Sequence, residues 1–173
     1  ILFGNAGNLT LSPSGAVVVN DYSSTQLLLF GGDGTLIARM GGKGGGPGEY
    51  QDVNGLAALA DSTWAVYDAG SSRVSFFGPD GAFRDSWSVP ATNMIGNGMI
   101  ATDASGALRI LQFVLPPSGD FMAAQGGLAR IADGGTGLSD TVLAPTLGVK
   151  VPEYRAQSVS NGGRSSTMVT SQL

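Results

Sequence analysis

The chain has 173 residues, of which 28 are glycine, 13% are charged and 42% are hydrophobic. Ordinary hydrophobicity combined with low charge argues against general disorder, and a net charge of −4 without a basic patch argues against nucleic acid as a partner. The chain has no histidine and no cysteine, which excludes His- and Cys-ligated metals, Ser-His-Asp triads and thiolate nucleophiles built from these residues. Its apolar runs are also shorter than the roughly 20 residues that a transmembrane helix needs.

The first half of the chain contains a repeat. Residues 55–86 align with residues 8–39 without a gap at a shift of 47. Each copy has a short apolar strand, a polar turn, a second strand ending in Asp, another small turn, a third strand ending in Phe, and an Asp-Gly turn. Strands of about 4 to 7 residues in a unit of roughly 42 to 50 residues are typical of the four-stranded blade of a β-propeller. No stretch has the capped 3.6-residue period of a helix, so helix is expected to be minor.

The aspartates of the repeat have structural explanations. Asp21 and Asp68 align at strand ends, where a carboxylate usually accepts hydrogen bonds from the backbone of the following turn. We therefore interpret them as structural rather than catalytic. The Asp-Gly pairs at 33–34 and 80–81 supply the positive φ angles that tight hairpins require.

A third copy follows in degraded form. Ile100–Thr102 and residues 107–115 correspond to the first two strands, and Gly127–Ile131 corresponds to the third. Residues 116–125 are predicted to form a loop insertion between them. A partial fourth copy has a turn at Asn161–Gly163, followed by a strand. The chain is thus predicted to be one all-β domain, 1–173, with blade-like repeats over about 8–50, 54–96, 97–142 and, in part, 149–173.

The segment that joins the first two copies carries a family resemblance. It is GGKGGGPGEYQDVNGLA, residues 41–57, and a D…R-V-x-x-F-x-x-D-G run follows it. The matching residues are Gly42, Gly44, Gly46, Pro47, Gly48, Glu49 and Tyr50, then Asp68, Arg73, Val74, Phe77, Asp80 and Gly81. Over residues 8–87 this pattern resembles bacterial six-bladed β-propellers of the NHL-like kind. The resemblance implies four-stranded antiparallel blades and says little about function, because propellers host hydrolases, lyases, ligand binders and scaffolds.

The resemblance raises a question of length. Six blades of about 45 residues need on the order of 270 residues, whereas this chain supplies three to four blades. Three blades cannot close a ring and would leave an apolar blade face exposed. The chain starts at Ile1, and we expect the sequence to be part of a longer chain. The alternatives are that two copies complete a ring, or that another protein covers the open face.

The sequence gives little support to two kinds of chemical site. A phosphate loop is disfavoured because Lys43 precedes the glycines, Pro47 interrupts them and no helix follows. Lactonase-type propellers hold a divalent cation with Glu, Asn and Asp, and the candidates here would be Asn54, Asn93 and Asn97, although nothing in their spacing places them in a channel. Lyase-type relatives rely on histidine ligands, which this chain lacks.

The aromatic residues and the exposed loops suggest packing and contact roles. Recurring aromatics are expected to pack between blades; they are Trp64, Trp87, Phe76, Phe77 and Phe83. The candidate interaction residues are Lys43, Glu49, Tyr50 and Tyr22, with the two tyrosines expected to be exposed beside loops. No catalytic residue, no metal ligand and no cofactor is predicted.

These observations favour a non-catalytic interaction or scaffold module of the propeller type. Low charge, few lysines and many Gly, Ser and Thr residues fit an exported protein, in the periplasm or at the cell surface. The partner is expected to be a protein, either a larger bacterial envelope or membrane-protein assembly on which this chain docks as an extrinsic subunit, or another copy. The alternatives are a metal-dependent, lactonase-type hydrolase and a surface-filament subunit with head-to-tail contacts between blade edges.

Overall fold

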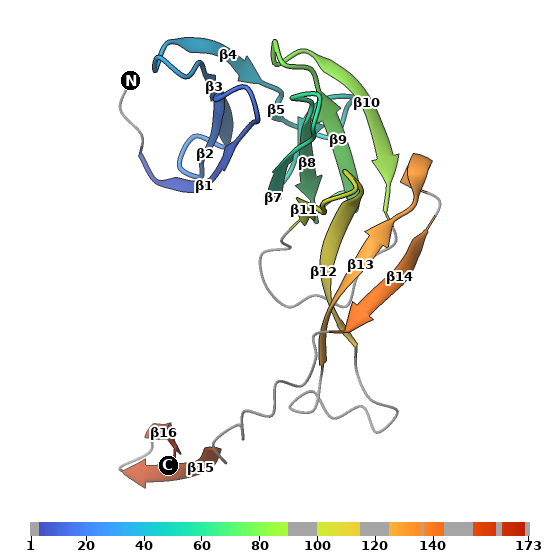
Figure 1. Ribbon diagram of the computed structural model, residues 1–173. Helices are drawn as coiled ribbons and strands as arrows, with labels where there is room; N and C mark the ends of the chain where they lie inside the picture. The colour runs from blue at the N-terminus through green and yellow to red at the C-terminus, as the bar shows by residue number, and fades with distance from the viewer. Residues whose placement is uncertain are drawn as a thin grey trace.

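The computed structural model describes residues 4–89, 100–114, 125–135, 137–143, 154–161 and 164–171. Three four-stranded antiparallel sheets lie side by side, and we call them blades 1, 2 and 3 in chain order (Figure 1). This confirms the predicted all-β class. The described residues contain one short 3₁₀ helix, η2 (Asp133–Gly135), and no helix among them is long and apolar enough to cross a membrane.

Blades 1 and 2 reproduce the predicted repeat strand for strand. Blade 1 consists of β1 (Ala6–Leu11), β2 (Val17–Asp21), β3 (Gln26–Phe30) and β4 (Leu36–Met40). Blade 2 consists of β7 (Val53–Ala58), β8 (Trp64–Asp68), β9 (Arg73–Phe77) and β10 (Phe83–Ser88). In both blades each strand pairs with the next one along the chain, so the second strand ends in the repeated Asp and the third in the repeated Phe.

Blade 3 lies where the degraded third copy is predicted. It consists of β11 (Ile100–Thr102), β12 (Leu108–Val114), β13 (Gln125–Ile131) and β14 (Leu138–Leu143). Gln125, predicted to lie in the loop insertion, already begins β13, and residues 116–124 lie outside the described residues. Where a partial fourth copy was predicted, β15 (Tyr154–Asn161) and β16 (Arg164–Ser171) form a two-stranded antiparallel sheet.

The Asp-Gly turns have the expected backbone. Gly34 and Gly81 adopt φ angles of 82° and 79°, which L side chains rarely adopt. The Asp33 carboxylate accepts a hydrogen bond from the backbone N–H of Thr35 at 2.9 Å, and this bond is the main reason that the pKa of Asp33 is lowered. The turn chemistry therefore fixes both hairpins in the same way.

The glycine-rich connector between blades 1 and 2 is an ordered loop rather than a plain linker. Its ends, β5 (Gly42–Lys43) and β6 (Glu49–Tyr50), pair in parallel. The Glu49 carboxylate turns back and accepts a hydrogen bond from the N–H of Gly46 at 2.8 Å. A Cβ on Gly44 would lie 2.1 Å from that carboxylate, so a larger residue there would displace the Glu49 side chain from its place against Gly46.

Two apolar clusters join the three blades. The first lies between blades 1 and 2 and contains Val18, Leu27, Leu29, Met40, Tyr50, Val53, Leu56, Trp64, Val66 and Phe77. The second lies between blades 2 and 3 and contains Ala57, Ala65, Tyr67, Val74, Phe76, Val89, Ile100, Leu108, Ile110, Ala129 and Ile131. Burial of this apolar surface between blades is the main favourable term that holds them together.

The recurring aromatics pack between blades as predicted, except Phe83, which is 36% exposed. Trp64 and Phe77 are each 1% exposed in the first cluster. Phe76 is buried in the second cluster, with its ring centroid 4.5 Å from that of Trp87. Phe83 meets the edge of Phe77 at 5.9 Å. Their positions account for these residues without a ligand.

The first strands of the blades are also tied to one another by hydroxyl groups. The Thr10 Oγ1 of β1 donates to the backbone oxygen of Leu56 in β7 at 3.2 Å. From the other side, the Thr102 Oγ1 of β11 donates to the backbone oxygen of Ala58 at 3.2 Å. The three blades thus share both apolar and polar contacts.

Candidate functional site

Strand alternation gives blade 1 two faces, and the described residues cover only one of them. Successive side chains of a strand point to opposite sides of the sheet. Val18 and Leu29 point towards blade 2 and are fully buried. Their neighbours Val17 and Phe30 point the other way and are only half-buried, while Leu11 from β1 is 62% exposed.

The strand register gathers five apolar residues on the uncovered side. Leu9 lies opposite Val19, Leu11 lies opposite Val17, and Val17 lies opposite Phe30. Residues directly opposite one another on adjacent strands share a face of the sheet. We call these five residues the open face of blade 1.

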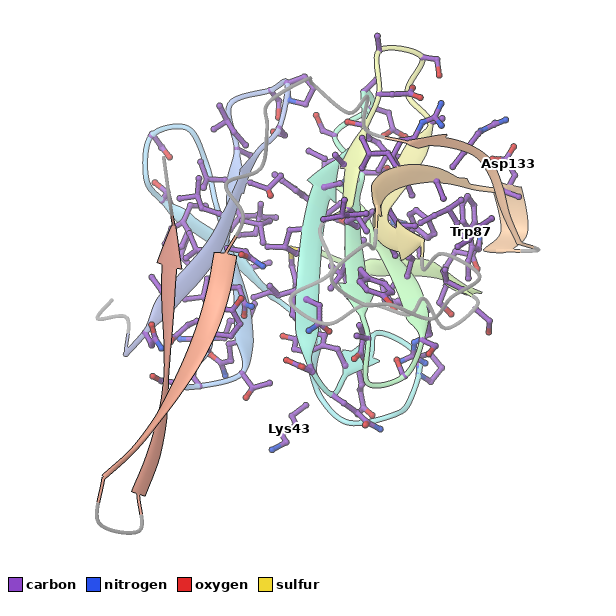
Figure 2. All side chains as sticks on the ribbon, turned by 90° about the horizontal axis from the view of Figure 1, so that it is seen from below. Lys43, Trp87 and Asp133 are labelled. Carbon is purple, nitrogen blue, oxygen red and sulfur yellow. The ribbon has the colours of Figure 1, made fainter. Side chains whose placement is uncertain are left out.

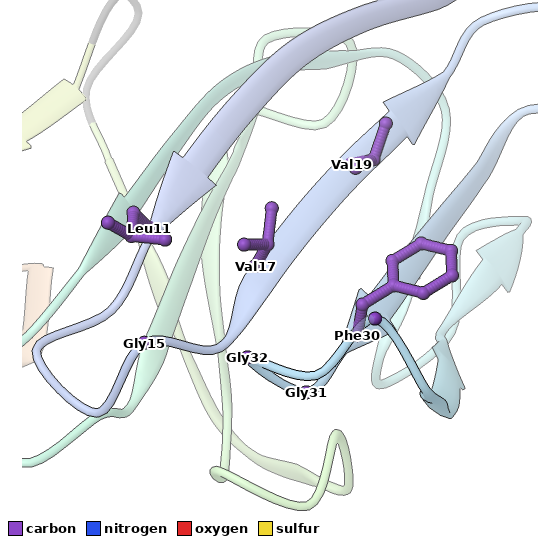
Figure 3. Close-up of a pocket in the computed structure, with 8 residues that line it drawn as sticks. Leu11, Gly15, Val17, Val19, Phe30, Gly31 and Gly32 are labelled. Atoms are coloured by element: carbon purple, nitrogen blue, oxygen red, sulfur yellow. The ribbon is translucent and has the colours of Figure 1, made fainter.

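The open face is hollowed. A hollow of about 430 Å³ is lined mainly by apolar side chains and turn glycines, namely Leu11, Gly15, Val17, Val19, Phe30, Gly31, Gly32 and Gly34. Figure 3 shows these side chains on neighbouring strands, with the glycines in the turns at their ends. A surface of this kind can bury the apolar side chains of a partner in its hollow, and it has few polar groups for chemistry.

The corresponding face of blade 2 is covered. At the shift of 47, Leu9, Val17, Val19 and Phe30 correspond to Leu56, Trp64, Val66 and Phe77. All four of the blade 2 residues are buried against blade 1 in the first apolar cluster. Leu9, Val17 and Phe30 are therefore more exposed than their counterparts in blade 2. Val19 is the exception, because it is 8% exposed and about as buried as Leu56 and Val66.

The Asp21 carboxylate binds backbone N–H groups, as expected from the place of this residue at a strand end. Its carboxylate accepts hydrogen bonds from the N–H of Asn5 at 3.0 Å, the N–H of Ser23 at 3.1 Å and the hydroxyl of Ser24 at 2.9 Å. The bond from Asn5 is the largest cause of the lowered pKa of Asp21. The structural interpretation of this residue is confirmed.

Asp68 repeats the arrangement in blade 2. Its carboxylate accepts from the N–H groups of Gln51 at 2.9 Å, Asp52 at 3.0 Å and Gly70 at 3.0 Å, and from the Ser71 hydroxyl at 2.6 Å. Each of these aspartates ties the segment that enters its blade to the turn after the second strand. That use of the carboxylate leaves it little capacity for chemistry.

Two of the predicted interaction residues lie in the connector. Lys43 is exposed, and Figure 2 shows its side chain projecting from the surface. Glu49 is exposed as well, but its carboxylate closes the loop on Gly46 as described above. Figure 2 also shows Trp87 beside Asp133, where η2 of blade 3 packs on β10 of blade 2.

The expectation that Tyr50 is exposed is wrong. Its side chain is 1% exposed, because it lies in the first apolar cluster under the connector. The Tyr50 hydroxyl donates to the backbone oxygen of Met40 at 3.0 Å and accepts from the N–H of Leu27 at 3.0 Å. Desolvation by this burial raises the pKa of the phenol.

Tyr22 is half-buried and belongs to a different part of the surface. Its ring lies over Gly7, where a Cβ would come within 1.7 Å of a ring carbon. It lines a small hollow of about 70 Å³ together with Asn20, Thr25, Gln51, Asp52 and Val53. Its role as a contact residue stays a prediction.

The candidate metal ligands do not converge in the described part of the chain. The Asn54 amide is already engaged, because its Nδ2 donates to Asp52 at 3.1 Å and its Oδ1 accepts from the N–H of Ala69 at 2.8 Å. Asn93 and Asn97 lie outside the described residues. Within the residues that are described, no three His, Cys, Asp or Glu side chains are grouped to hold a metal.

Comparison with solved structures identifies the fold. No protein-family model and no curated protein sequence matches the chain. A Bacteroides fragilis protein described as exported matches with a TM-score of 0.53 and 16% identity, over 83% of this chain and 51% of that one. A luciferin-regenerating enzyme matches with a TM-score of 0.51 and 16% identity, over 81% and 46% of the two chains. A streptogramin B lyase matches with a TM-score of 0.52 and 12% identity, over 96% and 62%.

These matches place the chain among proteins with the β-propeller fold, built from four-stranded antiparallel blades. At such low identity they show the fold alone. The chain spans about half to three fifths of the length of the proteins it matches.

Proposed function

We propose that this chain is a non-catalytic interaction module of the propeller type, which binds another protein through the open face of blade 1. The observation that carries this proposal is the contrast between Phe30, half-buried on the open face, and its counterpart Phe77, which is 1% exposed. Exposed apolar patches of this kind mark interaction surfaces in folded proteins.

The use of the polar groups supports a structural role for the motif residues. Three carboxylates accept hydrogen bonds from backbone N–H groups, namely those of Asp21, Asp68 and Glu49. The guanidinium of Arg73 donates hydrogen bonds to backbone carbonyls of the connector. We propose that these are the fold-defining residues of a six-bladed, NHL-like ring of which residues 1–173 supply about half. The two propeller-fold enzymes among the matches do not favour catalysis here, because their likeness is one of fold.

We further propose an exported location, in the periplasm or at the cell surface, as an extrinsic subunit of a larger envelope or membrane-protein assembly. The low charge and the abundance of Gly, Ser and Thr support it, as does the likeness to a protein described as exported. Lys43 and Tyr22 are proposed as secondary contact residues because both side chains reach the surface.

Site-specific photo-crosslinking in the cells that make the protein tests the proposal. A photoreactive phenylalanine analogue replaces Leu11 on the open face, and in the matched control it replaces Asp61, which is exposed in the β7–β8 turn. We expect a defined crosslink to another protein from position 11 and none from position 61. Equal labelling from both positions, or none from position 11, would contradict an interaction role for this face.

A further inference from the structure

We infer that the small hollow between blades 1 and 2 binds a single hard metal cation of the Ca²⁺ type. The hollow has a volume of about 70 Å³ and lies where the second strand of blade 1 ends and the first strand of blade 2 begins. It is lined by Asn20, Tyr22, Thr25, Gln51, Asp52 and Val53. This site goes beyond the proposed function and does not depend on what the open face of blade 1 contacts.

Asn20 is the residue that indicates a ligand. Its side chain is only 2% exposed, and its Nδ2 donates to the backbone oxygen of Val53 at 3.5 Å. This bond, although long, orients the nitrogen of the amide towards blade 2. The Oδ1 of Asn20 accepts no hydrogen bond from the part of the chain that the structure describes. Because a buried carbonyl oxygen needs a partner, the hollow must supply one.

The repeat shows that this polar position is special to the interface between blades 1 and 2. At the shift of 47, Asn20 corresponds to Tyr67, and Val53 corresponds to Ile100. Tyr67 is 3% exposed and lies with Ile100 in the second apolar cluster, between blades 2 and 3. A large aromatic residue is therefore accepted at this place in the repeat. The smaller Asn20 leaves space there and brings a polar group that the packing of the blades does not require.

The lining supplies oxygen atoms and one negative charge. Asp52 brings a carboxylate and Asn20 its amide oxygen, while Tyr22 and Thr25 carry hydroxyl groups. None of the six lining residues is basic. Carboxylate and amide oxygens are the ligands that Ca²⁺ prefers, and the ion takes about six to eight oxygens in flexible geometry, water included. The set fits a hard cation better than an anion or an apolar molecule.

The walls of the hollow are held in place before any ligand binds. On the side of blade 2, the Asp68 carboxylate accepts from the N–H groups of Gln51 and Asp52 at 2.9 and 3.0 Å. The Asn54 Nδ2 donates to the Asp52 Oδ2 at 3.1 Å and orients that carboxylate. On the side of blade 1, Asp21 binds the turn that follows β2. A site with fixed walls loses little conformational freedom when it binds a ligand.

The single carboxylate sets the expected affinity. Calcium sites of extracellular modules have dissociation constants of about 0.1 to 1 mM, and affinity falls with the number of charged ligands. An affinity in this range suits the exported location proposed above. Since the lining comes from both blades, a bound ion stabilises their interface.

Titration of the full chain with CaCl₂, followed by nuclear magnetic resonance, tests the site. We expect saturable shifts in the backbone amide signals of Tyr22, Thr25 and Asp52, with a dissociation constant of about 0.1 to 1 mM. The signals of the exposed turn at Asp61 should not move. Titration with NaCl at the same ionic strength is the control for screening of surface charges.

Two variants separate the charge from the amide oxygen. Asp52→Asn keeps an oxygen for Asn54 at an exposed position, and it should weaken Ca²⁺ binding at least about tenfold. Asp61→Asn is the matched control and should bind like the wild type. Asn20→Leu removes the buried oxygen. Ca²⁺ at about 10 mM should raise the melting temperature of the wild type by roughly 3 to 6 °C, and that of Asn20→Leu by about 1 °C or less.

The absence of saturable shifts up to about 20 mM CaCl₂, beyond those that NaCl causes, would show that the hollow holds only water and would overturn the inference. Shifts of equal size and affinity in wild type and Asp52→Asn would place the ion elsewhere and would also overturn it. Neither result decides the proposed function, because Asn20 shares its strand parity with Val18 and faces blade 2, away from the open face.

Discussion

The guanidinium of Arg73 donates a hydrogen bond to the backbone oxygen of Glu49, so the third strand of blade 2 holds the connector through which the chain enters that blade. A second bond reaches the backbone oxygen of Gly46 at 3.2 Å. The Arg of the R-V-x-x-F motif therefore acts on the glycine-rich motif that precedes it. The glycine-rich connector and the R-V-x-x-F run are therefore one structural unit.

Replacing Arg73 with Gln, the residue that blade 1 has at this position, should loosen the connector. The loop amides of Gly44, Gly46 and Glu49 are each hydrogen-bonded within the connector and should exchange with solvent about tenfold faster or more. Hydrogen exchange with mass spectrometry measures this. The control is Arg84→Gln, which breaks only an exposed pair with Asp80 and should leave the connector unchanged. Equal exchange in the two variants would contradict the role of Arg73 in holding the connector.

Asp68→Ala should destabilise the protein strongly. It removes a buried acceptor that serves three backbone N–H groups and a hydroxyl, and we expect a loss of about 3 kcal/mol in the free energy of unfolding. Asp61→Ala is the matched control, because Asp61 is exposed and accepts a single bond from Thr63, and it should cost less than about 1 kcal/mol. Urea unfolding of both variants measures the difference. A loss below 1 kcal/mol for Asp68→Ala would count against its role.

The lowered pKa of Asp21 predicts a loss of stability in acid. The hydrogen bond from Asn5 holds the folded-state pKa below its unfolded value of about 3.9. A depressed folded-state pKa means that the stabilisation is complete above the unfolded pKa and is lost as the pH falls through the folded one. The advantage of the wild-type protein over Asp21→Asn should therefore be constant near neutral pH and shrink below about pH 4. An advantage independent of pH would contradict the assignment.

Replacing each of two equivalent glycines with alanine should separate the stability cost of backbone strain from the cost of a clash between blades. Gly34 and Gly81 share a positive φ, so alanine at either costs about 1 kcal/mol for the backbone. At position 81 the added Cβ also meets Ala38, and this overpacking should cost about 1–3 kcal/mol more. Thermal unfolding of Gly34→Ala and Gly81→Ala measures the gap. Equal losses would mean that blade 2 does not rest on blade 1 in solution.

The parts of the fold that the sequence predicts are those set by local chemistry. Asp-Gly turns need a positive φ, and an Asp at a strand end needs only nearby N–H donors, so the strands of blades 1 and 2 follow from the pattern around Asp21, Gly34 and their counterparts. Tyr50 was misplaced for the opposite reason. Its hydroxyl partners, Leu27 and Met40, belong to strands earlier in the chain, and no local pattern shows that the connector folds over them.

The candidate site, the open face of blade 1, is predictable from the sequence only in part. The chain is too short for the six blades of a full ring, and this predicts that one blade face is uncovered. It does not predict which residues form that face. The signal was present in the aligned repeats, because Val17 and Phe30 share their strand parity with the buried Trp64 and Phe77. What the sequence could not show is that blade 2 covers only one side of blade 1, since that depends on how the sheets pack.

Hydroxyl-radical footprinting of the chain in its native cellular setting and of the isolated chain tests the central claim most directly. In the isolated chain, Leu9, Leu11 and Phe30 should be oxidised readily, because the first two are 64% and 62% exposed and the third is half-buried. In the native setting the account predicts that their oxidation falls to the level of the buried Leu56 and Phe77. Unchanged oxidation of all three in the native setting would show that the open face has no partner, and would contradict the account.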